Sequence, residues 1–119
     1  MVQVFQYDEG RDTWVQMGNN IYGNEAFDGF GMSVSIDGSG TRILAGAGKA
    51  DQVGIKNNGE ARVFDFDETI NDWVQVGNTI HGECELDESG RAVDISRDGS
   101  RVVVGAPLNW YYSGHIRVK

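Results

Sequence analysis

Few side chains in this sequence have the type and spacing that catalysis or metal binding requires. The two histidines, His81 and His115, have no second histidine or cysteine at the spacing of a metal site. The single cysteine, Cys84, has no histidine–asparagine arrangement nearby that would activate a thiol nucleophile. We also find no nucleophile elbow and no phosphate-binding loop. We therefore expect a protein that is not an enzyme.

Two regions expected to be loops carry side chains that suit ligand binding. Three consecutive aromatic residues can stack on a sugar or contact a protein, or instead pack against a neighbouring unit. A short acid beside glycine can capture a ligand, although it commonly accepts backbone N–H groups. The candidate ligand-binding residues are Asn109, Trp110, Tyr111, Tyr112 and Asp87. The expected ligands are a protein or a glycan.

The charge balance excludes several classes of partner. The 119 residues include 10 Lys and Arg against 18 Asp and Glu, for a formal net charge of -8. Binding to nucleic acid or to an anionic membrane surface needs a basic face, so we expect neither. No apolar run approaches the roughly 20 residues that span a bilayer, so membrane insertion is not expected. Met1 leads directly into a strand-like run, which predicts no signal peptide.

The chain is an internal duplication, and this observation carries the fold prediction. The two copies align without a gap from Val4 to Ala47 at an offset of 59 residues (73 − 14 = 59). Further along, residues 58–63 resemble residues 113–118 at an offset of 55 (113 − 58 = 55). The recurring structural residues include Trp14 with Trp73, Gly31 with Gly90, and Gly46 with Gly105.

One repeat predicts four short strands. In the central copy these are Met32–Ile36, Arg42–Ala45, Glu60–Phe66 and Trp73–Val76. Four antiparallel strands in a unit of roughly 40–60 residues are typical of a β-propeller blade. The alternative is a sandwich of two four-stranded sheets.

Three features of the repeat bear on its packing. The glycines at 46 and 105 favour the propeller, because its strands crowd near the axis. The recurring Trp14 and Trp73 indicate packing between blades. The apolar run Val102–Val104 predicts a strand that is buried on both faces.

These motifs resemble the FG-GAP repeat of integrin-α-type β-propellers. The run Gly29–Ser35 resembles the "FG" half, and Val104–Pro107 resembles the "GAP" half, followed by a strand-like Ser113–Val118. The first copy lacks the proline of the motif, and the second has Ser89 in place of the phenylalanine. The resemblance implies a propeller with a role in adhesion at an extracellular or cell-surface location.

The family often carries a calcium loop with the pattern D-x-[DN]-x-[DN]-G between its first two strands. The corresponding hairpins here, at residues 37–40 and 96–99, hold one carboxylate each. Calcium takes about six to eight oxygen ligands, several of them carboxylates, so we expect no metal ion and no cofactor. Plain turn chemistry for Asp and Gly explains these residues better.

Residues 1–119 form a single unit of two repeats that begins and ends inside a blade. The last two strands of a blade lie at 2–17, a whole blade at 30–77, and the first three strands of a blade at 90–118. A propeller closes with roughly four to eight blades, so two cannot close alone. We expect two, three or four copies to close a ring, and we favour three. The rival explanation is a piece of a longer chain with more repeats.

The predicted function is a self-assembling propeller module that serves as a binding or adhesion scaffold. The alternative is a lectin-like propeller that binds carbohydrate through the aromatic loop at 109–112.

Overall fold

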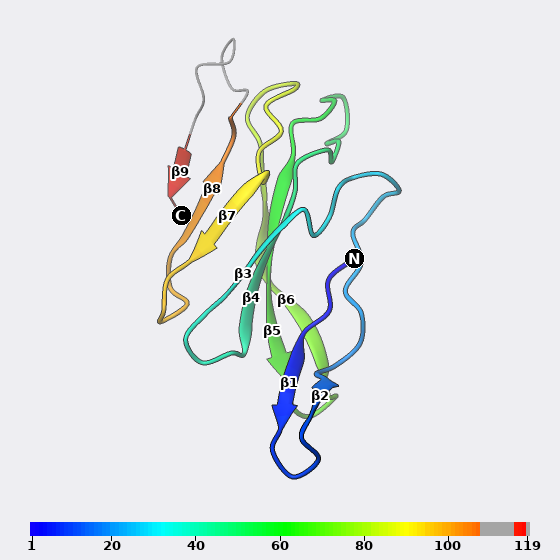
Figure 1. Ribbon diagram of the computed structural model, residues 1–119. Helices are drawn as coiled ribbons and strands as arrows, with labels where there is room; N and C mark the ends of the chain where they lie inside the picture. The colour runs from blue at the N-terminus through cyan, green and yellow to red at the C-terminus, as the bar shows by residue number, and fades with distance from the viewer. Residues whose placement is uncertain (108–115, 119) are drawn as a thin grey trace.

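The structure is a computed structural model that describes residues 1–107 and 116–118. Within this part the chain forms strands and turns without a helix. Antiparallel sheets of two, four and three strands lie side by side (Figure 1). The strands are β1 (Phe5–Asp8), β2 (Thr13–Gln16), β3 (Ser33–Ile36), β4 (Arg42–Ala47), β5 (Glu60–Asp67), β6 (Asp72–His81), β7 (Ala92–Ile95), β8 (Val102–Gly105) and β9 (Ile116–Val118). The all-β class built from antiparallel sheets is therefore confirmed.

The central sheet has the order β3-β4-β5-β6, in which each strand pairs with the next along the chain. Its strands are rich in β-branched and aromatic residues, which suit a pleated, half-buried surface. Tight turns join β3 to β4 and β5 to β6, and Gly40 and Asn71 adopt positive φ there (75° and 54°), whereas a longer loop joins β4 to β5. Glycine and asparagine tolerate this conformation, so the turn residues fit the turns that they make.

The two outer sheets repeat parts of the central one in the same register. In β1-β2, Phe5 pairs with Gln16, as Phe64 pairs with Gln75 in β5-β6. In β7-β8-β9, Val103 pairs with Val118, as Leu44 pairs with Val63 in β3-β4-β5. The chain thus contains one four-stranded unit, with a copy of its last two strands on one side and a copy of its first three strands on the other.

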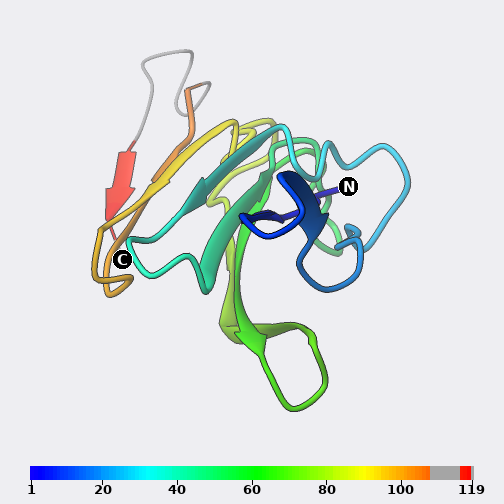
Figure 2. The ribbon, with the colours of Figure 1, turned by 60° about the horizontal axis from the view of Figure 1, so that its bottom comes forward.

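The central sheet lies between the two outer sheets (Figure 2). Apolar side chains on both of its faces form two separate clusters. The cluster beside β1-β2 contains Val2, Ile21, Phe30, Ile43, Ala45, Ala47, Ala50, Phe64 and Trp73. The cluster beside β7-β8-β9 contains Leu44, Ala61, Ile95, Val102 and Val104. Burial between sheets is therefore what holds the three sheets together.

Two sequence predictions about packing are wrong. The run Val102–Val104 is not buried on both faces, because Val103 is 39% exposed while its neighbours are buried. The reason is that the β7-β8-β9 sheet has a neighbouring sheet on one side only, whereas β4 has one on each side. For the same reason Trp14 is exposed, although its repeat partner Trp73 packs between sheets as predicted.

The structure also differs from the sequence predictions in the length of one strand and in the number of sheets. Strand β6 continues to His81, well beyond the predicted end at Val76. The alternative prediction, a sandwich of two four-stranded sheets, does not match the structure. The described residues form sheets of two, four and three strands, because the repeat is split across the two ends of the chain.

Candidate functional site: the faces of the stacked sheets

The contact between β1-β2 and the central sheet centres on Trp73. Its indole Nε1 donates a hydrogen bond of 2.8 Å to the main-chain oxygen of Met17. The ring lies against Gly18, where a Cβ atom would come within 2.9 Å of the indole Cδ1. Gly18 has a positive φ of 75°, so glycine serves both the turn and the close approach here.

An amide–carboxylate pair lies next to this indole. The Asp72 carboxylate accepts from the main-chain N–H of Asn19 at 3.1 Å and from its side-chain amide at 3.0 Å. The hydrogen bonds from Asn19 lower the pKa of Asp72. Indole and carboxylate together fix the register of the two sheets.

The contact between the central sheet and β7-β8-β9 depends on a close backbone approach. A Cβ atom at Gly46 would collide with the main-chain oxygen of Gly90. Ser33 Oγ donates to that same oxygen at 2.7 Å. The crowding predicted for Gly46 is therefore real, and glycine is required there for space rather than for an unusual φ.

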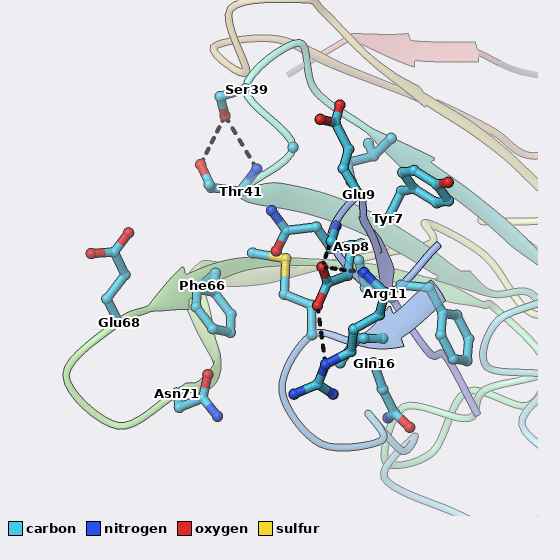
Figure 3. Close-up of a pocket in the computed structure, with 18 residues that line it drawn as sticks. Tyr7, Asp8, Glu9, Arg11, Gln16, Ser39, Thr41, Phe66, Glu68 and Asn71 are labelled. Atoms are coloured by element: carbon cyan, nitrogen blue, oxygen red, sulfur yellow. Dashed lines mark hydrogen bonds and ion pairs between the residues drawn. The ribbon is translucent and has the colours of Figure 1, made fainter. Parts of the chain in front are cut away.

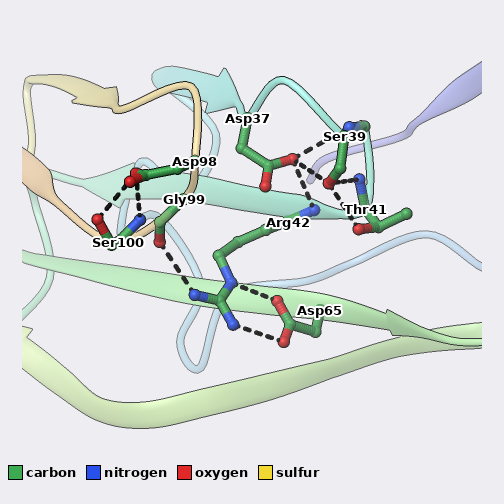
Figure 4. Close-up of polar contacts among 9 residues, drawn as sticks. Asp37, Ser39, Thr41, Arg42, Asp65, Asp98, Gly99 and Ser100 are labelled. Carbon is green, nitrogen blue, oxygen red and sulfur yellow. Dashed lines mark hydrogen bonds and ion pairs between the residues drawn. The ribbon is translucent and has the colours of Figure 1, made fainter.

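Arg42 connects two strands of the central sheet to the next sheet. Its guanidinium donates to both oxygens of Asp65, at 2.6 and 2.9 Å, and to the main-chain oxygen of Gly99 at 2.9 Å (Figure 4). The bidentate pair lowers the pKa of Asp65 and raises that of Arg42. Arg42 and Arg101 are equivalent in the repeat, but the sequence pattern did not indicate this bridge.

The residues equivalent to these contacts lie open, two of them in the end sheets (Trp14 and Gly105) and one in the central sheet (Gly77). Trp14 is 65% exposed, against 8% for Trp73. A Cβ atom at Gly77, the equivalent of Gly18, would meet no atom within 4 Å. At Gly105, the equivalent of Gly46, its contacts with the described residues would be ordinary ones, from 3.5 Å.

We name two surfaces from these open residues. The hairpin face comprises Phe5, Tyr7, Trp14, Val34 and Ile36, all of which are exposed. The β8 face comprises Gly77, Val103 and Gly105. The equivalents of the hairpin face that pack against the preceding sheet are Phe64, Phe66, Trp73, Val93 and Ile95.

The acids of the hairpins that the calcium pattern singles out are engaged in their own turns. Asp37 accepts the main-chain N–H groups of Gly40 and Arg42 (3.0 and 3.3 Å). Asp98 accepts from the N–H and hydroxyl of Ser100, and these bonds, with one from Ser96, lower its pKa to about 2. Both carboxylates therefore stabilise turns, as Figure 4 shows.

Asp87, a candidate ligand-binding residue, is also engaged in its loop. It is buried, and its carboxylate accepts the main-chain N–H of Cys84 at 2.8 Å. Its repeat partner Asp28 accepts the N–H of Phe30 at 2.9 Å. The recurrence of this acid thus reflects loop structure, which was the alternative to ligand binding. The aromatic loop at 109–112 lies outside the described residues.

Loops from different units meet at the upper end of the stack in Figure 1. A shallow pocket of about 370 Å³ lies among them, and its charged residues are Glu25, Asp51, Lys56 and Glu85. These come from the two loops that precede β3 and β7 and from the loop between β4 and β5. Loops that follow different sheets therefore meet at one end of the stack.

A larger groove of about 1080 Å³ lies between the β1-β2 hairpin and the turns of the central sheet (Figure 3). The carboxylate of Asp8, which lines the groove, accepts the main-chain N–H groups of Gly10 and Arg11 (3.0 and 3.3 Å). Asp8 thus closes its own turn, like its equivalent Asp67, which accepts from Thr69 at 2.9 Å. The groove is the space between two sheets, and Ile36 of the hairpin face lies at its rim.

The thiol of Cys84 is not activated as a nucleophile. Burial, Asp87 and Glu83 raise the pKa of the Cys84 thiol, which disfavours the thiolate. Across residues 1–107 and 116–118, His, Cys, Asp and Glu side chains do not gather in threes that could hold a metal ion. The same part of the chain contains no helix of a length and apolarity that would cross a membrane.

The structure thus brings Trp73, Gly46 and Gly90 into contacts between sheets and leaves Trp14 and Gly105 open. Gly31 lies just before strand β3, and its N–H donates to the main-chain oxygen of Gly46 at 3.0 Å. Gly18 and Gly77 were not singled out, although their recurrence four residues after each tryptophan is visible in the sequence. Comparison with protein-family models gave no match, and a search of curated proteins found no relative.

Proposed function

We propose that this chain is a non-enzymatic β-propeller repeat module that associates with further copies to close a ring of blades. The ring would then serve as a binding or adhesion scaffold. A single observation carries the proposal: residues equivalent in the repeat are buried where a neighbouring sheet covers them and exposed where none does. Trp73 with Trp14 is the clearest pair, and Ile95 with Ile36 is another.

The sheets supply complementary parts of one unit. The β1-β2 hairpin corresponds to β5-β6 of the central sheet, and β7-β8 corresponds to β3-β4. Strand edges and apolar faces left open tend to pair with another chain. A second copy fits both, because it carries the missing strands in the required register.

The scaffold role rests on the loop end of the stack. Loops are where binding residues concentrate on a rigid framework. Loops from two units gather there, and their charged residues include Glu25, Asp51 and Glu85. With a net charge of -8, the assembled ring would favour partners with a basic surface.

Light scattering on the pure chain over a range of concentrations tests the proposal. The expected mass is two, three or four times the 13.0 kDa of one chain, with three copies favoured. A folded monomer at every concentration would overturn it. Circular dichroism on the same samples confirms that the chain is folded.

A further inference from the structure

We infer that the association is head to tail, with the hairpin face of one copy docked on the β8 face of the next in the register of the internal sheet contacts. In this register Trp14 Nε1 donates to the main-chain oxygen of Val76, and the indole covers Gly77. The inference rests on the proposed function and adds the polarity and residue contacts of the interface.

The internal contact of Trp73 supplies the register. Trp73 contacts Met17 and Gly18, and the repeat offset of 59 residues converts these to Val76 and Gly77. Gly77 has nearly the same positive φ as Gly18, 72° against 75°, although Gly77 lies within β6 and Gly18 follows β2. The surface that would receive Trp14 is therefore already formed in the single chain.

Trp14 is held ready for the contact by its own sheet. It packs edge-to-face on Tyr7 with ring centroids 5.4 Å apart and an interplanar angle of 64°. Trp73 packs on Phe66 in the same way, at 5.3 Å and 65°. The exposed indole thus has the orientation of the buried one, and its docking costs little conformational entropy.

A second contact follows from the glycine pair. Gly46 abuts the main-chain oxygen of Gly90 in the next sheet. The same offset places Gly105 of one copy against the main-chain oxygen of Gly31 in the next. Val103 would then cover Val34 and Ile36, which the β1-β2 sheet leaves exposed.

Docking in this register also requires that residues 2–4 of one copy displace β9 of the other. Residues 2–4 and β9 both correspond to residues 61–63 of the central sheet, through the offsets of 59 and 55. Strand β9 holds that position beside β8 in the single chain. Residues 2–4 of the incoming copy would replace it, so β9 competes with assembly.

Complementary variants test the polarity. Trp14→Ala removes the hairpin face, and Gly105→Ala obstructs the β8 face. The single chain tolerates both changes, because Trp14 is exposed and a Cβ at Gly105 meets only ordinary contacts. Each variant alone should self-associate at least about 30-fold more weakly than the unmodified chain, the loss typical of a hot-spot residue.

A mixture of the two variants should form a 1:1 dimer and nothing larger, because each contributes one intact face. The double variant, mixed with either single variant, should give no gain in mass. Phe27→Ala is the matched control, since Phe27 and its equivalent Leu86 are both exposed and lie on neither face. It should assemble like the unmodified chain.

The outcomes distinguish the register of docking from self-association itself. If the unmodified chain assembles but the mixture is no heavier than its components, the head-to-tail register is wrong and self-association stands. The register is equally wrong if Gly105→Ala assembles normally. If the unmodified chain remains monomeric at every concentration, both proposals are overturned.

Discussion

Replacing each of the two repeat tryptophans with alanine should give very different losses of stability. Trp73 is 8% exposed and Trp14 is 65% exposed, although both occupy the same place in the repeat. An aromatic side chain can bury roughly 150–250 Å². At about 25 cal/mol per Å², the buried part stabilises the fold by about 3.5–6 kcal/mol at Trp73 and about 1–2 kcal/mol at Trp14.

Measured Trp→Ala losses in protein cores are about 3–5 kcal/mol, in agreement with the area figure for Trp73. The change at Trp73 also leaves the Met17 carbonyl without its indole donor, which adds about 1 kcal/mol. We therefore expect Trp73→Ala to lower the free energy of unfolding by about 4–6 kcal/mol, and Trp14→Ala by less than about 2 kcal/mol.

Urea unfolding followed by circular dichroism measures both values. The experiment belongs at a chain concentration low enough that the unmodified chain is monomeric by light scattering. Equal losses for the two variants under those conditions would refute the reasoning, because they would mean that burial does not distinguish the two positions. Repeating the measurement at high concentration should increase the loss for Trp14→Ala only, since assembly buries that indole.

Three further predictions concern the crowded glycine at 46, the buried carboxyl of Glu60 and strand β9. Gly46→Ala should lower the thermal midpoint strongly in a melting experiment, because its Cβ collides with the Gly90 carbonyl, whereas Gly105→Ala should leave the monomer's midpoint nearly unchanged. Burial raises the pKa of Glu60 above its unfolded value of about 4.5. As pH rises through that value, the Glu60 carboxyl loses its proton in the unfolded state before it does so in the folded state. Urea titrations should therefore show a free energy of unfolding that falls with pH until the folded pKa of Glu60 is passed, and Glu60→Gln should abolish this fall. A chain that ends at Pro107 lacks β9 and should assemble at lower concentration in light scattering; weaker assembly would contradict the strand exchange.

Much of the fold could be predicted from local residue patterns. The duplication, the four strands of each unit and the tight turns all depend on residues close together in the chain. Asp98 and Gly99, for example, form the predicted turn through hydrogen bonds within a few residues. Such preferences act wherever the segment lies, so the sequence reveals them directly.

The candidate site was predictable only in part. The recurrence of Trp14 and Trp73 indicated packing between units, and Gly46 indicated crowding. The Arg42 bridge was not anticipated, because the Gly99 oxygen that it binds is 57 residues away and only the stacking of sheets brings it near. Asp87, a predicted ligand-binding residue, accepts the Cys84 N–H within its own loop, as the alternative interpretation of this recurring acid predicts.

Local residue patterns specify which residues are equivalent and which strands and turns they form. Which member of each equivalent pair is buried depends on the stacking of the sheets: Trp73 is buried rather than Trp14, and Ile95 rather than Ile36. The physical reason is that burial requires a second sheet against the face, and no local pattern of residues specifies whether a neighbour is present. Exposed and buried members of these pairs therefore occur together even within the central sheet, where Ile36 is exposed and Trp73 is buried.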